Sequence, residues 1–181
     1  MFNSFRLPFS GFKKRRPQKY KVLLQQGPVE IRMYPKTLKA KLSVTGNLEE
    51  AFTTGFKTLK EYLNGNNFKV KKMPITGPVL QIPRADGWEL DIFLPANMDP
   101  SSAPKPINRF IKFEAIPQRK VAVMSHYGTL SQKQFEKISG ELQEWLHAHN
   151  FMTGSVARVA RFTKLLNLPI FFKQEIQIDV N

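Results

Sequence analysis

Cysteine is absent from the 181 residues, which excludes disulfides, thiolate catalysis and cysteine-ligated metals. No uninterrupted apolar run reaches the ~18 residues that a membrane-spanning helix requires. The N-terminal residues lack the apolar core and small-residue cleavage site of a secretory signal, so we expect them to be retained. Together these absences predict a cytoplasmic protein.

Acidic residues are also scarce, because 14 Asp and Glu stand against 28 Lys and Arg and give a net charge of +14. Half of this excess lies near the N-terminus, before the first acidic residue, Glu30. We interpret residues 1–19 as a basic arm, either simply solvated or in contact with an anionic membrane surface through its phenylalanines and lysines. No nucleic-acid-binding motif accompanies the charge, so we expect no specific nucleic-acid partner.

An internal repeat organises the rest of the chain. Residues 29–67 align without a gap on residues 111–149, at a constant offset of 82 positions. The alignment pairs Pro35 with Pro117, Ala40 with Ala122, Ser43 with Ser125, Gly46 with Gly128 and Leu48 with Leu130. We therefore expect two similar halves, about 20–99 and 107–181, within one domain spanning residues 20–181.

Each half carries the pattern of a β-α-β-β unit. Residues 37–46 alternate between apolar and polar, as expected of a strand with one buried and one wet face. A helix should follow from Asn47, capped with Glu50, and its counterpart should begin at Ser131, capped with Gln134. Two apolar segments with strand character follow each helix. The pattern predicts an α+β fold, a distorted antiparallel β-barrel with two flanking helices.

Three stretches resemble the SOUL haem-binding family: VEIRMYP at 29–35, MPITGPV at 73–79 and PIFFKQEIQI from Pro169. The second is similar to the family signature Met-x-Met-Thr-x-Pro-Val, with Ile75 in place of the second methionine. The resemblance covers residues from about Tyr20 to the end. It implies the same barrel and helices, and binding of haem or another tetrapyrrole, without catalysis, in a shallow apolar cleft beside the first helix. Transport, buffering and sensing of the ligand all remain open.

A haem needs apolar walls for its ring and cations for its propionates. Candidates on the first helix are Phe56, Lys57 and Lys60, and near the C-terminus they are Lys164 and Lys173. Phe56 could equally be a core residue, and exposed lysines usually only solvate a helix. The family often has a basic residue near Thr53 and Thr54, so a propionate contact from that turn is not expected.

His126 is the candidate axial ligand of the iron, because it aligns with Val44 on the expected inner face. A histidine on a strand is also commonly a half-buried, hydrogen-bonded residue. Met73 is a weaker candidate. No histidine has a spaced partner typical of a metal motif.

Two rival functions remain. Catalysis has no support, since adjacent Ser125 and His126 point to opposite faces of a strand, and Glu89 with Asp91 match many solvated strand pairs. The family's architecture also resembles gyrase-inhibitor-like effector domains, so a module for another small organic ligand is the alternative. The sequence leaves the oligomeric state open.

Overall fold

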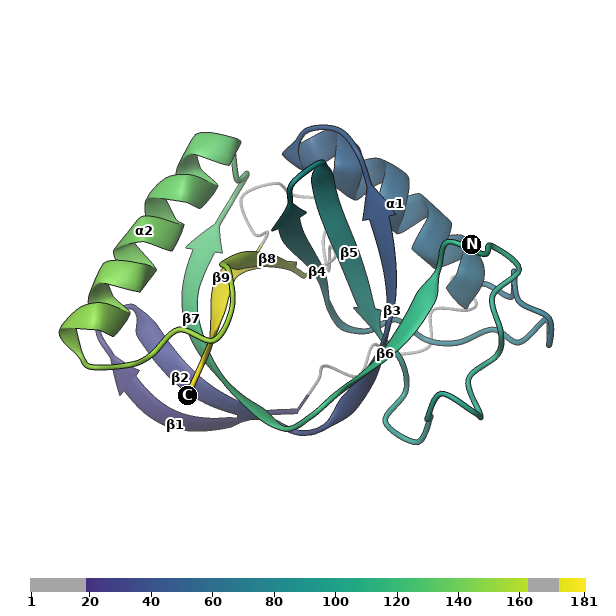
Figure 1. Ribbon diagram of the computed structural model, residues 1–181, viewed down its shortest axis with the longest axis horizontal. Helices are drawn as coiled ribbons and strands as arrows, with labels where there is room; N and C mark the ends of the chain where they lie inside the picture. Colours follow the sequence, from purple (N-terminus) through teal and green to yellow (C-terminus); the bar gives the residue numbers. More distant parts are fainter. Residues whose placement is uncertain (1–18, 163–172) are drawn as a thin grey trace, which may run out of the picture.

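The computed structural model describes residues 19–162 and 173–181, and these residues form nine strands and two α-helices. In chain order the elements are β1 (Lys21–Gln26), β2 (Val29–Tyr34), β3 (Thr37–Val44), α1 (Leu48–Leu63), β4 (Thr76–Arg84), β5 (Gly87–Phe93), β6 (Lys112–Ile116), β7 (Arg119–Tyr127), α2 (Gln132–Ala148), β8 (Arg158–Arg161) and β9 (Lys173–Val180). Both helices lie on the outer side of a strongly curved sheet (Figure 1).

The two helices begin where the sequence predicts. The Asn47 side chain accepts hydrogen bonds from the backbone amides of Glu49 and Glu50, and the Glu50 carboxylate accepts one from the Asn47 amide. Ser131 and Gln134 form the same reciprocal box at the start of α2. Both predicted capping boxes are therefore confirmed. Neither helix is long and apolar enough to cross a membrane, within the residues described.

The order of the strands in the sheet is β1-β2-β7-β9-β8-β4-β5-β3-β6, and every pairing is antiparallel. Apart from β1, replacing each strand by its counterpart in the other half gives the same order read from the opposite end of the sheet. The first strand of each half pairs with the other half: β2 with β7, and β6 with β3. The halves thus exchange their first strands.

The sheet is open, so the predicted closure into a barrel is wrong. Strand β6 pairs with β3 and β1 pairs with β2, which leaves β1 and β6 as the two edges of the described sheet. No pairing joins β1 or β2 to β6 in the described residues, as closure into a barrel would require. Strand β1 was not predicted because all six of its residues are exposed and it lacks the alternation of a half-buried strand.

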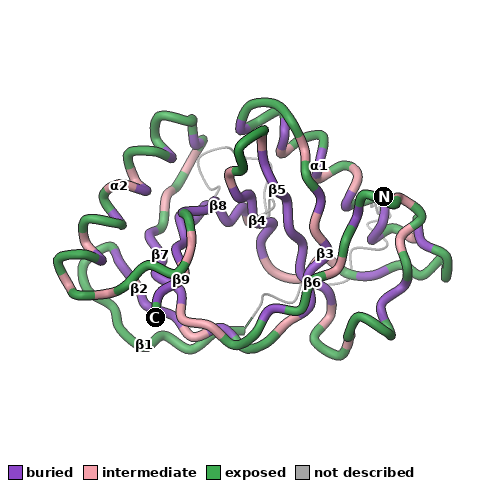
Figure 2. The backbone as a smooth tube through the Cα atoms, viewed as in Figure 1, coloured by how far each residue is buried: buried purple, intermediate pink, exposed green. Residues whose placement is uncertain are grey.

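Packing differs on the two faces of the sheet. The main core lies between the sheet and the helices and includes Leu59, Leu90, Leu142 and Ile176. The opposite face, here called the concave face, carries two small apolar clusters, one around Leu80 and the other around Val121. Most central strands are buried along their length, whereas the outer surfaces of the helices are exposed (Figure 2).

Candidate functional site

A stacked pair of phenylalanines marks one flank of α1. The rings of Phe52 and Phe56 lie 5.5 Å apart between centroids and are nearly parallel, at 10°. Both are half-buried and pack against the main core, because they lie beside the fully buried stripe of the helix. Their remaining surface gives α1 a flat aromatic platform.

Arg161, at the end of β8, borders this platform. Its guanidinium carbon lies 4.5 Å from the centroid of the Phe52 ring. Nη1 donates to the Glu49 carboxylate at 2.7 Å and Nε donates to the Gln81 side-chain oxygen at 3.0 Å, while Nη2 is buried and has no partner among the described residues. The structure therefore joins an aromatic surface to a cation with an unused donor, and we call Phe52, Phe56 and Arg161 the α1 platform.

The two predicted lysines of α1 are both exposed, but they differ in direction. Lys60 is four residues after Phe56 and so lies on the same flank, next to the platform. Lys57 is rotated by about 100° from Phe56 and points further into solvent. Only Lys60 is placed to reach a ligand that covers the phenylalanines.

The two C-terminal lysines stand apart from this group. Lys164 lies outside the described residues. Lys173 lies on the concave face of β9, where Nζ contacts the Glu175 carboxylate at 2.8 Å and lies 5.6 Å from the Phe162 ring centroid. Burial lowers the pKa of Lys173. The hydrogen bond and the charge of Glu175 together raise this pKa by more, so the net shift is upward. The structure does not bring Lys173 together with Phe56, since α1 covers the other face of the sheet.

His126 lies on β7, in the second half, and is half-buried. Its Nε2 donates to the Thr129 carbonyl at 2.9 Å. Met73 is packed in the main core. Within residues 19–162 and 173–181, no cluster of three histidines or carboxylates could hold a metal ion.

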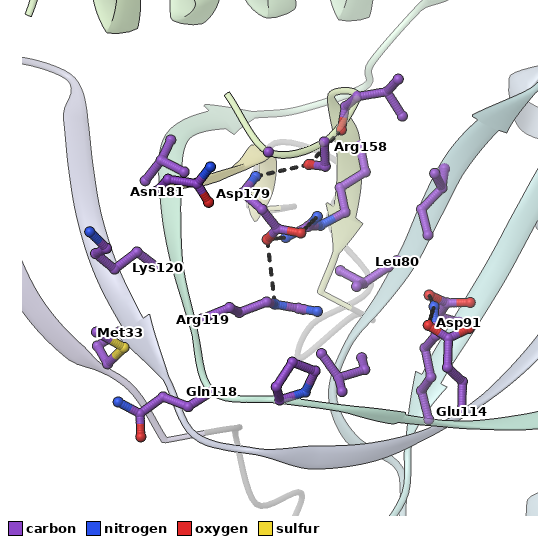
Figure 3. Close-up of a pocket in the computed structure, with 18 of the residues that line it drawn as sticks. Met33, Leu80, Asp91, Glu114, Gln118, Arg119, Lys120, Arg158, Asp179 and Asn181 are labelled. Carbon is purple, nitrogen blue, oxygen red and sulfur yellow. Dashed lines mark hydrogen bonds and ion pairs between the residues drawn. The ribbon is translucent and has the colours of Figure 1, made fainter. Parts of the chain in front are cut away.

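A second candidate is a cavity of about 830 Å³ on the concave face, between the two halves (Figure 3). The first half contributes Lys39, Leu80, Ile82 and Asp91, and the second contributes Arg119, Arg158 and Asp179. Because the exchanged strand β6 and its proline turn close one side, residues from both halves line a single space. No pattern in the sequence predicted this cavity, because its lining depends on which strands pair.

Two clusters of charged side chains face each other across the cavity. Arg158 donates to both oxygens of Asp179, at 3.0 and 2.7 Å, and Arg119 Nε lies 3.4 Å from the same carboxylate. On the opposite wall, Lys39 donates to Asp91 at 2.8 Å. Within residues 19–162 and 173–181, three buried atoms of this lining have no hydrogen-bond partner: Arg119 Nε, Arg158 Nε and Asp91 Oδ1. Figure 3 shows Arg119 extending from the Asp179 side toward the wall that carries Leu80 and Asp91.

The carboxyl of Asp91 is strongly perturbed. Burial raises its pKa to about 6, against the opposing effect of the Lys39 ammonium. The prediction that residues 37–46 have one face in water is wrong for Lys39, which is buried. Glu89 and Asp91 on the neighbouring strand are buried as well. These side chains neutralise one another inside a concave surface, where the alternation of the sequence indicated solvent.

Comparison with known proteins identifies the chain's relatives. The family model described as SOUL heme-binding protein matches residues 15–179. No curated protein matches the chain. Among solved structures, the C-terminal domain of EcmrR is similar with a TM-score of 0.63 at 11% identity, over 90% of this chain and 98% of that one. A structure titled as a hydrolase from Listeria innocua has a TM-score of 0.55 at 10% identity, over 88% and 94% of the two chains. At such identities these structures share the fold alone.

Proposed function

Because the chain belongs to the SOUL heme-binding protein family, we propose that it binds haem or a related tetrapyrrole, and that the macrocycle rests on the α1 platform. The observation that carries this proposal is the parallel pair of Phe52 and Phe56 beside the unpartnered Nη2 of Arg161. A flat, conjugated ring stacks on such a pair, and a propionate would satisfy the buried donor.

The platform explains how orientation would be set. The phenylalanine surface excludes water from one face of the ring, while Arg161 and Lys60 supply cations for the propionates. Glu49 already pairs with Arg161, so a propionate would share or displace this exposed carboxylate. His126 lies in the other half of the molecule, and a haem on α1 would bind without it. Such a site suits reversible loading, as transport or buffering of a tetrapyrrole requires.

A haemin titration monitored at the Soret band tests the proposal. The double variant Phe52→Ala/Phe56→Ala should weaken binding at least tenfold, because each ring contributes roughly 1 kcal/mol or more of contact. Ile138→Ala is the matched control, since Ile138 occupies the position of Phe56 in the second helix and should leave the affinity unchanged. Equal affinities of wild type and the double variant would contradict binding at α1.

The cavity on the concave face supports a second candidate function, the binding of a small organic ligand other than haem. Its unpartnered groups define the chemistry: the two arginines offer donors to an acceptor such as a carboxylate, and Asp91 Oδ1 accepts from a donor at the other end. Leu80 and Ile82 provide an apolar wall between them.

Thermal-shift screening of small carboxylates separates the two candidates. A ligand of the cavity should raise the melting temperature of wild type and of Phe52→Ala/Phe56→Ala equally. It should not raise the melting temperature of Arg119→Gln. Stabilisation that survives Arg119→Gln would place the ligand elsewhere.

A further inference from the structure

Two loops lie side by side beyond the C-terminal end of α1, toward the right of Figure 1. The first follows the helix at residues 67–72, and the second leads into β6 at residues 105–112. The amide of Phe68 donates to the Lys105 carbonyl at 3.0 Å, and Asn67 forms a β-bridge with Pro106. The two loops therefore present one continuous surface.

This surface is unusually apolar for a solvent-exposed region. Phe68, Val70, Ile107 and Phe110 are between 55% and 80% exposed. They make up four of the eleven large hydrophobic side chains that are exposed in the described part of the chain, although the two loops are short. Contiguous exposed apolar groups of this kind mark an interaction surface.

Positive charge surrounds these side chains. Six cations are exposed in the same two loops: Lys69, Lys71, Lys72, Lys105, Arg109 and Lys112. Neither segment contains an acidic residue, and none of the ion pairs within residues 19–162 and 173–181 involves these cations. We call the four hydrophobic and six basic residues the loop patch.

The first loop is held in place rather than free to collapse. Asn67 is fully buried, and its amide donates to the carbonyls of Tyr62 and Lys71, at 3.2 and 2.8 Å. Its oxygen accepts from the amides of Lys69 and Lys71, and Val70 adopts a positive φ of 49°. This anchoring keeps Phe68 and Val70 directed outward, so their exposure is part of the folded structure.

We propose that the loop patch docks on the surface of an anionic lipid bilayer. Apolar side chains surrounded by lysines fit the interface of such a membrane, where the former enter the headgroup region and the latter meet acidic lipids. Two of the four apolar residues, Val70 and Ile107, are aliphatic and have no ring to stack on a base, which favours lipid over single-stranded nucleic acid. This inference does not rest on haem binding, and it concerns residues other than the basic arm.

Vesicle flotation with the full chain is the first test, using phosphatidylcholine vesicles with and without about a third of phosphatidylserine. Wild type should bind the anionic vesicles and not the neutral ones. Lys69→Ala/Lys71→Ala/Lys72→Ala should weaken binding by about fivefold for each lysine removed. Phe68→Ser/Phe110→Ser should weaken it more than about tenfold, because two rings no longer enter the interface.

Matched variants separate the loop patch from net charge and from the arm. Lys36→Ala/Lys133→Ala/Lys137→Ala removes the same charge from exposed positions elsewhere, and Tyr127→Ser/Met152→Ser removes comparable exposed apolar surface. Both controls should retain more binding than their patch counterparts. The proposal is overturned if wild type ignores anionic vesicles, if patch and control variants bind alike, or if poly-uridine binding depends on the patch more than vesicle binding does.

The absence of cysteine allows a direct test of insertion. A polarity-sensitive fluorophore attached through Phe110→Cys should shift to the blue when anionic vesicles are added, and one attached through Tyr127→Cys should not. An unchanged spectrum at position 110 in a sample that binds vesicles would contradict insertion of the loop patch.

Discussion

Arg32 on β2 donates Nη1 to both carboxylate oxygens of Glu175 on β9, at 3.0 Å each, and neither side chain is more than 1% exposed. Strand β7 lies between β2 and β9 in the sheet, so the arginine reaches across one strand to the next. It thereby ties an exchanged strand of the first half to the second half. Further contacts complete the group, since Arg32 also binds Glu30 and Tyr34, and Gln177 donates to Glu175.

Removing Arg32 should destabilise the fold, because the buried Glu175 loses the more buried of its two cationic partners and keeps only Lys173 and Gln177. Arg32→Met is expected to lower the free energy of unfolding by about 3 kcal/mol, measured by urea denaturation. Lys137→Ala, which breaks the exposed pair with Glu141, should change it by less than about 0.5 kcal/mol. Similar small effects of both substitutions would show that the buried group contributes little.

Asp91 should make stability depend on pH. Its pKa is about 6 in the folded protein and near 4 when unfolded, so the folded state holds the proton more tightly between these values. The free energy of unfolding contributed by Asp91 should therefore fall as pH rises from 4 to 6, by up to about 3 kcal/mol, and stay constant above.

The measurement is the difference in stability between wild type and Asp91→Asn at several pH values. Asp179 changes the pH dependence of stability in the opposite sense. Burial raises the pKa of Asp179, but the Arg158 guanidinium overcomes this effect and the net shift is downward. Its contribution is common to both proteins and cancels in the difference. A difference that does not vary between pH 4 and 6 would show that the pKa of Asp91 is ordinary.

Two glycines within helices should respond oppositely to alanine. A Cβ at Gly55 would lie 2.8 Å from side-chain carbons of Leu90 and Val44 in the core, whereas nothing lies within 4 Å at Gly140. Gly55→Ala should cost about 1–3 kcal/mol through overpacking, and Gly140→Ala should gain about 0.5–1 kcal/mol through helix propensity. Thermal unfolding of both variants tests this contrast, which fails if Gly55→Ala is the more stable of the two.

The two lysines of α1 should contribute unequally to haem affinity. Lys60→Ala should weaken haemin binding about five- to tenfold, because it removes a cation on the flank of Phe56. Lys57→Ala, which removes the same charge from a solvent-directed position, should change affinity by less than about twofold. Equal losses would indicate a nonspecific effect of charge.

Local patterns predicted the parts of this fold that depend on neighbouring residues. The capping pairs at Asn47 and Ser131 locate both helices, alternation identifies β3, and short apolar segments after each helix identify four further strands. Pairing between distant strands leaves no local signal, so neither the exchange of β2 and β6 nor the open sheet could be inferred. The cavity was missed for the same reason, because alternation assigns Lys39 and Asp91 to a polar face without showing that the face is enclosed.

The α1 platform was only partly predictable. Phe56 was identified from its position on the helix, and the spacing of four residues to Phe52 could have indicated the stacked pair. Arg161 offered no comparable signal, since it stands among alternating residues of a strand and becomes part of the platform only when β8 packs near α1.

The exchange of first strands has a consequence for the independence of the two halves. A polypeptide limited to one unit would lack the strand that covers one edge of its own sheet and would carry another whose partner strand lies in the missing unit. Such a unit could complete itself only by trading strands with a second copy, as a domain-swapped dimer does. The present chain is in this sense a swapped dimer whose subunits have been joined, and its two fragments, if cut between residues 99 and 107, should fold together or not at all.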